Sequence, residues 1–223
     1  MHRSTWLATW AIAICVSTPL AADEGTWVSL FDGKTLGGWT PVPLGRVEGE
    51  TKWEVVDGMI EGSGVQSMLF SPRGDYKNFR FRAELKINDG GNSGMYIRVP
   101  KEATFTNGYE IQVNSTHKDP IKTGSVYTHV HLFKQLVKPD TFFTQEIEAI
   151  DKMYRGAMVT HIKVSVNGEV LFEFLDHDRS WTEGHFGFQQ HDPGSHVTIR
   201  KIEVMELPEE REPAAKKAKK KQA

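Results

Sequence analysis

Two neighbouring stretches of the sequence decide the fold: residues 90–98 are GGNSGMYIR and residues 108–113 are GYEIQV. Both predict β-strands, because polar and apolar side chains alternate and successive strand residues point to opposite faces of a sheet. One predicted face is the core, with Met95, Ile97, Val99, Tyr109, Ile111 and Val113. The opposite face holds Tyr96 and Arg98 on the first strand and Glu110 and Gln112 on the second.

The polar face of this predicted hairpin has two interpretations. A loop over residues 100–107, centred near residue 104, places Arg98 opposite Glu110. An arginine and a glutamate beside Gln112 are typical of a ligand-binding floor. The alternative is a cross-strand ion pair on a solvated surface, which contributes well under about 1 kcal/mol. The alternation alone favours neither interpretation.

The composition suits a single all-β domain. The chain has 223 residues, of which 39% are hydrophobic, enough for a sizeable core. Turn signals recur roughly every 8–12 residues between short apolar runs, which is typical of a β-sandwich. Residues 79–87 alternate apolar and charged side chains, and Asn167-Gly168 between two alternating stretches is the strongest hairpin signal. We therefore predict two antiparallel sheets over residues 23–207.

The two ends of the chain differ from this domain. Residues 1–22 resemble a secretory signal, with Arg3 before an apolar stretch too short to span a bilayer and small residues before Asp23. We expect export to the periplasm or the extracellular space and no stable membrane span after cleavage; the alternative is an uncleaved anchor. Because Cys15 is the only cysteine, the mature domain has no disulfide framework.

The C-terminal residues 208–223 predict a disordered, lysine-rich tail. The tail has six basic and three acidic residues, a net charge of +3, and could tether the protein to anionic polymers. Residues 23–207 have 20 basic and 26 acidic residues, a net charge of −6. Such a domain repels phosphate backbones, so we expect no nucleic acid bound by the fold itself.

Several short motifs in a fixed order extend the pattern along the chain. They are SLFDGKTLGGW (29–39), WEVVDGMI (53–60), YKNFRF (76–81), TGSVY (123–127), Asn167-Gly168, GHFGFQQH (184–191) and VTIRKI (197–202). Together with the opening stretches, they resemble the 3-keto-disaccharide hydrolase-type domain, from about Trp27 to Leu207. The resemblance implies a concanavalin-type jelly roll with a concave polar face. It also implies cleavage of sugars oxidised at C3, by hydrolysis or by elimination and hydration.

In the predicted site, the polar side chains of several strands share this concave face. Arg98 and Glu110 match the family's recurrent arginine and glutamate, and Gln189 and His191 match its Gly-x-x-Gln-x-His element. We predict catalytic roles for Glu110, Arg98, His191 and Tyr127, and substrate binding by Asn92, Gln112, His129 and Gln189.

The implied chemistry needs three kinds of group. The ketone at C3 acidifies the proton at C2; a base removes it, an enolate forms, and a general acid protonates the group that leaves C1. Glu110 or a histidine could be the base, Arg98 or a metal could stabilise the enolate, and Tyr127 or His191 could be the acid. The spacing leaves these roles open.

A divalent metal is a further hypothesis for the site, although no cofactor is certain. His129 and His131 share a strand parity, and with Glu110 they would form a histidine and carboxylate ligand set. The alternative is a solvated or sugar-facing pair. The chain also departs from the family pattern, because Val113 and Asn114 follow Gln112 where an acidic residue is usual.

The sequence leaves several functions in competition. The first hypothesis is an exported hydrolase or lyase for 3-keto-glycosides, with a small saccharide as its partner. The alternative is a non-catalytic carbohydrate-binding module on the same fold, since function depends on the site rather than the fold. A third is an envelope interaction protein. The predicted floor is rich in titratable groups and has one aromatic ring, which favours catalysis.

Overall fold

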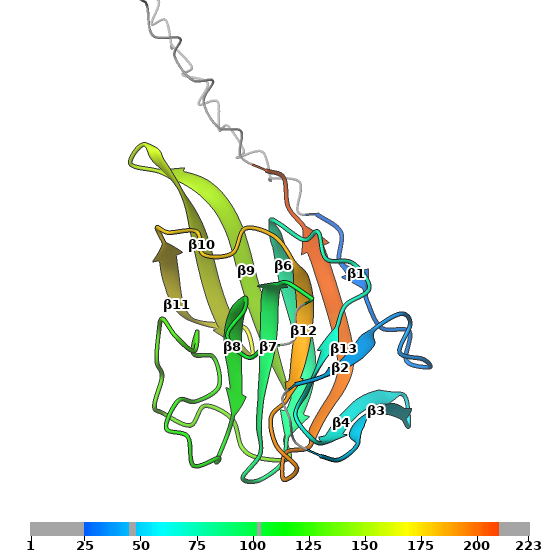
Figure 1. Cartoon of the computed structure of the whole chain (residues 1–223). Coiled ribbons are helices and arrows are strands. Elements are labelled where there is room, and N and C mark those ends of the chain that lie inside the picture. The colour runs from blue at the N-terminus through cyan, green and yellow to red at the C-terminus, as the bar shows by residue number, and fades with distance from the viewer. Residues whose placement is uncertain (1–24, 45–47, 102–103, 210–223) are drawn as a thin grey trace, which may run out of the picture.

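The chain folds into two stacked antiparallel β-sheets, as the sequence predicts (Figure 1). The computed structural model describes residues 25–44, 48–101 and 104–209, and within these ranges it has thirteen strands and no helix. Nothing in these ranges forms a helix long and apolar enough to span a bilayer. The predicted signal at 1–22 lies outside the described residues, as does the predicted tail from residue 210 onward.

The larger sheet has eight strands in the order β11-β10-β9-β6-β13-β4-β3, and β1 pairs with β13. Its strands are β1 (Val28–Ser29), β3 (Thr51–Val56), β4 (Met59–Gly64), β6 (Phe79–Ile87), β9 (Phe143–Tyr154), β10 (Ala157–Val166), β11 (Glu169–Asp176) and β13 (Val197–Glu206). The β10–β11 hairpin turns at Asn167 and Gly168, whose φ angles of 51° and 80° fit the predicted tight turn.

The smaller sheet has five strands in the order β2-β5-β12-β7-β8. These strands are β2 (Thr40–Pro43), β5 (Ser67–Phe70), β7 (Asn92–Val99), β8 (Tyr109–Asn114) and β12 (His185–Gln190). The predicted hairpin of the two opening stretches is the β7–β8 pair. Its register places Tyr96, not Arg98, opposite Glu110.

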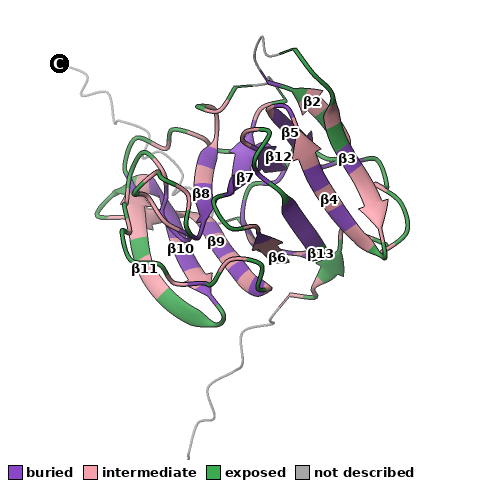
Figure 2. Cartoon of the chain, turned by 90° about the horizontal axis from the view of Figure 1, so that it is seen from below, coloured by how far each residue is buried: buried purple, intermediate pink, exposed green. Residues whose placement is uncertain are grey.

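The core lies between the sheets and follows from the alternation of side chains. On β6, buried residues alternate with partly exposed ones over the whole strand, and Figure 2 shows the same kind of banding on β9. The rings of Phe81 on β6 and Phe186 on β12 stack with centroids 3.9 Å apart, which joins the two sheets. Met95, Ile97, Ile111 and Val113 of the opening stretches belong to this core, as predicted.

The alternation fails at one predicted position, near the end of β7. Arg98 has a φ of 50°, and the β7–β12 register shifts next to it. The resulting irregularity reverses the parity of the last two residues of the strand. Arg98 therefore points between the sheets, and Val99 packs with Tyr96 in a smaller cluster on the outer face. The predictions of Arg98 on the polar face and of Val99 in the central core are both wrong.

Candidate functional site

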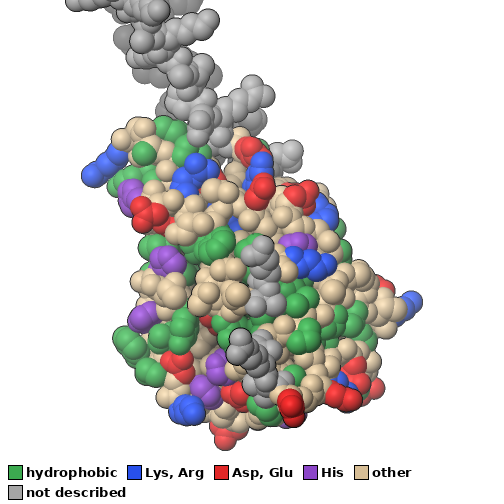
Figure 3. All heavy atoms as spheres, in the orientation of Figure 1, with side chains coloured by type: hydrophobic (Ala, Val, Ile, Leu, Met, Phe, Trp, Pro, Cys, Tyr) green, Lys and Arg blue, Asp and Glu red, His purple; other side chains and the backbone are tan. Residues whose placement is uncertain are grey.

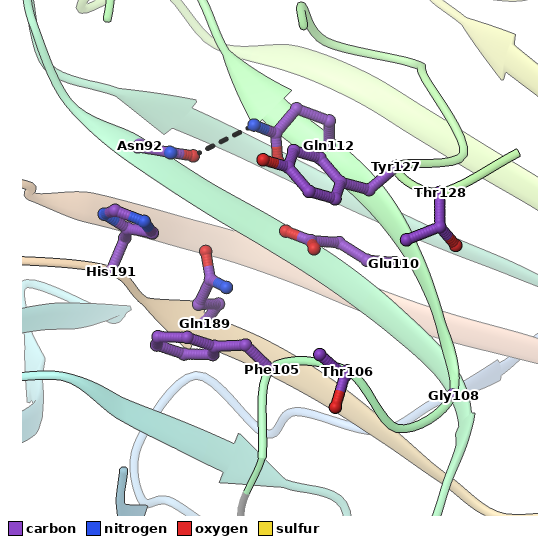
Figure 4. Close-up of a pocket in the computed structure, with 10 residues that line it drawn as sticks. All are labelled: Asn92, Phe105, Thr106, Gly108, Glu110, Gln112, Tyr127, Thr128, Gln189 and His191. Atoms are coloured by element: carbon purple, nitrogen blue, oxygen red, sulfur yellow. Dashed lines mark hydrogen bonds between the residues drawn. The ribbon is translucent and has the colours of Figure 1, made fainter. Parts of the chain in front are cut away.

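A pocket of about 170 Å³ lies on the outer face of the five-stranded sheet. Its floor comes from β7, β8 and β12, and its walls come from the segments around residues 105 and 127 (Figure 4). In Figure 3 this side of the molecule shows several histidine side chains and interspersed charges of both signs. The lining residues are Asn92, Phe105, Thr106, Gly108, Glu110, Gln112, Tyr127, Thr128, Gln189 and His191.

The alternation of β8 directs the polar floor outward. Tyr109, Ile111 and Val113 are anchored in the core, so Glu110 and Gln112 face the pocket. The neighbouring strand makes room for the glutamate with Gly94. A Cβ at Gly94 would lie 2.5 Å from Glu110 Oε1, a separation that real Cβ contacts do not reach. The position of the carboxyl group therefore depends on a missing side chain in β7.

Glu110 is the most perturbed carboxyl group of the site. Burial raises its pKa to about 8, and hydrogen bonding to Tyr96 opposes this shift without cancelling it. Among the described residues no lysine or arginine forms an ion pair with it. A carboxyl group deprived of hydration and of a cation keeps its proton. Glu110 is therefore largely a neutral carboxylic acid near pH 7.

The two amides beside Glu110 share a hydrogen bond. With one orientation of the Gln112 amide, its Nε2 donates to Asn92 Oδ1 at 3.2 Å (Figure 4). The opposite orientation suits the surroundings better, because the nitrogen then lies 3.0 Å from Glu110 Oε1 and 3.1 Å from the carbonyl oxygen of Ser93. Gln112 is thus a donor to the carboxyl group, and it fixes the floor of the pocket.

His191 lies on the opposite wall and is held by its neighbour Asp192. Its Nδ1 lies 2.8 Å from Asp192 Oδ2, and its ring stacks on Phe105 with an interplanar angle of 12°. Partial burial is the largest influence on the pKa of Asp192 and opposes ionisation. Hydrogen bonds from His191 and from the Gly194 amide nevertheless hold this pKa below its usual value. Because the Asp192 carboxylate accepts a hydrogen bond from Nδ1–H, the Nε2 of neutral His191 keeps its lone pair.

Gln189 lines the same pocket and has an acceptor atom without a partner within the described ranges. Its Nε2 donates to the Tyr96 hydroxyl at 3.0 Å. Its Oε1 is buried and has no hydrogen-bond partner among the described residues. Such an atom costs free energy until a donor reaches it, and a sugar hydroxyl is such a donor. The side chains of Gln189, Glu110 and His191 point toward one common space in Figure 4.

Tyr127 forms the upper wall, and its proton is already engaged. Its hydroxyl donates to Asp119 Oδ2 at 3.0 Å. Burial and this hydrogen bond both raise the pKa of Tyr127. A phenol whose proton is held by a carboxylate is a poor general acid, so its position favours substrate contact over proton transfer.

The structure brings together Asn92, Glu110, Gln112, Tyr127, Gln189 and His191, and it separates two predicted residues from them. Arg98 is fully buried and donates to Asp151 Oδ1 at 2.8 Å on the larger sheet. His129 packs against the rings of Tyr109 and Phe174. Neither residue lines the pocket, so the predicted floor is wrong at both positions.

The structure also does not form the predicted metal-ligand set of Glu110, His129 and His131. Residues 126–130 form a tight turn in which Val126 and Val130 pair, so strand parity does not apply to the histidines. His131 Nε2 lies 2.6 Å from the carbonyl oxygen of Tyr127 and does not join Glu110. Within the described ranges, one group of three metal-type ligands occurs, and it consists of His117, His191 and Asp192.

Sequence reasoning missed the loop residues of the site. Phe105 and Thr106 come from the segment before β8, and Asp192 follows β12. The run Asp192-Pro193-Gly194 signals a turn, and its Asx turn is formed by the Gly194 amide and Asp192 Oδ1 at 2.9 Å. That signal locates the turn, but the contact with His191 depends on the folded loop.

The comparisons with known proteins agree with this fold. The chain belongs to the family of 3-keto-alpha-glucoside-1,2-lyase-like domains, whose model matches residues 26–205. A curated Bacteroides thetaiotaomicron protein named 3-keto-disaccharide hydrolase is 28% identical over 196 residues. That match covers 75% of this chain and 64% of the relative, so the chain spans less than two thirds of its length.

Solved structures share the architecture. A candidate glycosyl hydrolase from Parabacteroides distasonis is 20% identical, with a TM-score of 0.61 over 82% of this chain and 100% of its own. The carbohydrate-binding module CBM66 from Bacillus subtilis is 19% identical, with a TM-score of 0.56 over 75% of this chain and 95% of its own. Identities this low show the fold alone, and they confirm the all-β jelly roll.

Proposed function

We propose that this chain cleaves 3-keto-glycosides in the pocket on the outer face of the five-stranded sheet. The family assignment supports a substrate oxidised at C3. The observation that supports catalysis is the pairing of two unlike titratable groups in one pocket, a carboxyl group that keeps its proton and a histidine oriented by a carboxylate. Environments that separate the proton affinities of two groups are typical of acid–base sites.

The reaction is a β-elimination in this proposal. A base takes the proton from C2, and the electron pair of the broken C2–H bond forms an enolate with the C3 carbonyl group. The enolate then forms the C1=C2 bond as the C1–O bond breaks. The leaving oxygen takes a proton and departs as an alcohol. Addition of water to C1 then gives the free 3-keto sugar, so elimination and hydration sum to hydrolysis.

His191 is the base in this scheme. Its Nδ1 is held by Asp192, so its Nε2 lone pair is the free proton acceptor of the ring. Once protonated, the imidazolium can return the proton to the leaving oxygen. The Asp192 carboxylate fixes the ring and stabilises the cation that forms.

Glu110 is the electrophile for the C3 carbonyl oxygen. As a neutral acid it can donate a hydrogen bond that strengthens as the enolate develops. This role replaces the one predicted for Arg98, whose side chain lies between the sheets. Gln189 Oε1 supplies an acceptor for a ring hydroxyl.

A glycoside pair that differs only at C3 tests the proposal. The wild-type protein should release aglycone from a chromogenic 3-keto-glucoside and leave the unoxidised glucoside intact, because only the ketone acidifies the C2 proton. His191→Asn should lower kcat by about 100-fold or more. His177→Asn is the matched control, since His177 is exposed and contacts Tyr154 away from the pocket.

Three results would count against the proposal. Equal turnover of the two glycosides would reject a ketone-dependent mechanism. Undiminished turnover by His191→Asn would reject His191 as the base. Tight saccharide binding without turnover would favour a carbohydrate-binding module on this fold.

A further inference from the structure

A second cavity of about 560 Å³ adjoins the pocket and is more open to solvent. It is lined by Gly90, His117, Lys118, His191 and Asp192. His191 is the one residue that lines both cavities, so its ring forms the partition between them. The proposed base therefore faces two adjoining spaces, each bordered by polar groups.

We infer that this second cavity is the leaving-group subsite and that His117 binds a hydroxylated leaving group, a second sugar residue, through its Nε2–H. The inference rests on the proposed function, in which the ketosugar occupies the first pocket. With the ketosugar there, C1 and its leaving oxygen face the partition. His191 then lies between the C2 proton and the oxygen that must be protonated.

The hydrogen bonding of His117 identifies it as a donor. The backbone amide of Asp119 donates to His117 Nδ1 at 3.2 Å, so this nitrogen carries no proton. A neutral imidazole whose Nδ1 accepts a hydrogen bond carries its proton on Nε2. The nearest carboxylate oxygen, Asp192 Oδ2, is 3.8 Å from Nε2 and too far for a hydrogen bond. Among the described residues, no acceptor lies within hydrogen-bond distance of this donor.

The remaining lining fits a sugar better than an apolar or strongly charged group. Lys118 and Asp192 bring one charge of each sign, and sugar hydroxyls can both donate and accept hydrogen bonds. Gly90 leaves the floor open, because a Cβ built there would meet no atom within 4 Å. The Gly90 amide is tied to Thr116 Oγ1 at 2.8 Å, which holds this floor in place.

A metal ion is the rival occupant of the same cluster. The ligand atoms of His117, His191 and Asp192 lie within 4.8 Å of one another. A metal on His117 Nε2 needs a lone pair there, and the Asp119 amide directs the lone pair to Nδ1 instead. The hydrogen bonding therefore favours a polar organic ligand over an ion.

Two substrates with the same ketosugar but different leaving groups distinguish an effect on the subsite from an effect on the reaction itself. We would compare a glucosyl-glucose disaccharide oxidised at C3 with methyl 3-keto-glucoside, whose leaving group is too small to reach His117. His117→Ala should lower kcat/KM for the disaccharide about tenfold, the value of one lost hydrogen bond, and should change the methyl glycoside less than twofold. His117→Gln keeps an N–H donor near the position of Nε2 and should restore part of the loss.

The control is His196→Ala, because His196 is exposed and borders a different cavity. Equal losses on both substrates, or no loss on either, would overturn the subsite.

Zinc titration tests whether a metal ion occupies the cluster instead: stoichiometric Zn²⁺ binding that disappears in His117→Ala would overturn the inference. If no 3-keto-glycoside is turned over, the proposed function fails. Calorimetry with the two sugars then decides the subsite, which predicts that His117→Ala weakens the disaccharide alone.

Discussion

Arg98 and Glu110 belong to neighbouring strands and to one sequence pattern, yet the structure uses them in opposite ways. Arg98 is fully buried and fully partnered: Nε and Nη2 donate to the Lys77 carbonyl oxygen, and Nη1 donates to Asp151, Thr160 and the Trp181 carbonyl oxygen. Glu110 faces the pocket, and no described cation pairs with it. The ion-paired Arg98 joins the sheets, whereas the Glu110 carboxyl group, which has no cationic partner among the described residues, keeps a proton that can serve in catalysis.

Removing the buried charge of Arg98 should have the largest effect on the free energy of unfolding. Arg98→Met leaves the Asp151 carboxylate with Arg179 as its remaining ion-pair partner and leaves the Lys77 carbonyl oxygen without its arginine donors. Breaking a buried pair from one side costs about 3–5 kcal/mol, and we expect the lower end because Arg179 stays. Urea unfolding monitored by tryptophan fluorescence measures the loss. A cost below about 1 kcal/mol would mean that Arg98 does not hold the sheets together.

Removing the ionisable group of Glu110 should increase the free energy of unfolding, by an amount that depends on pH. The native carboxyl group has a pKa of about 8, compared with an ordinary value of 4.5, so the folded protein keeps a proton that the unfolded chain releases. Stability therefore falls as the pH rises from about 4.5 to about 8 and then levels off. Glu110→Gln should match the wild type near pH 4 and be more stable at pH 9 by about 2 kcal/mol. This is less than the full linkage value, because the carboxylate accepts hydrogen bonds from Tyr96 and Gln112.

Thermal unfolding of both proteins at pH 4, 6 and 9 measures this difference. The matched control is Glu173→Gln, because Glu173 is exposed and its pKa is lowered by His161 rather than raised. That variant should lose stability with rising pH relative to the wild type. A Glu110→Gln variant that is less stable at pH 9 would show that the carboxylate has a favourable partner.

The comparison also shows which parts of the molecule follow from the sequence. Strand alternation and turn chemistry are local, so β6, β8 and the Asn167-Gly168 hairpin could be predicted with their faces. The pocket floor from Glu110, Gln112 and Gln189 followed from the same rule.

The parts that could not be predicted depend on contacts between distant residues. Arg98 turns inward beside Gly184, where a Cβ would lie 2.4 Å from the Arg98 carbonyl carbon, so a glycine 86 positions away permits the irregular backbone. His129 does not line the pocket, because Val126 pairs with Val130 and the segment between them is a turn rather than the predicted strand. His117 and Asp192 lie on loops, and no local period announces their contact.

The pH dependence of turnover should sharpen the role of Glu110. If the neutral acid is the active form, kcat/KM falls as the pH rises through about 8, by about tenfold for each further unit. Glu110→Gln cannot ionise but keeps an N–H donor, so its profile should lack this alkaline loss. Initial rates with a chromogenic 3-keto-glucoside from pH 6 to 9.5 provide the measurement. A wild-type rate that increases through pH 8 would instead identify the carboxylate as the base.

The smallest effect should come from an ion pair on the solvated face of the larger sheet. Arg80 donates to Glu146 Oε1 through Nε at 2.8 Å and Nη2 at 2.6 Å, a geometry as close as that of Arg98 with Asp151. The Arg80 side chain is 31% exposed, whereas that of Arg98 is 0% exposed. Water and salt screen the outer pair, so we expect a coupling below about 1 kcal/mol that weakens further in 1 M salt.

A double-mutant cycle with Arg80→Met and Glu146→Gln, followed by urea unfolding at low and high salt, measures that coupling. The same cycle on Arg98 and Asp151 should give a larger value that salt hardly changes, because Arg98 is fully buried and the Asp151 side chain is only 13% exposed. Similar couplings for the two pairs would mean that burial is not what distinguishes them. The contrast would then have to be sought in the hydrogen bonds that Arg98 makes to backbone carbonyl oxygens, which Arg80 does not share among the described contacts.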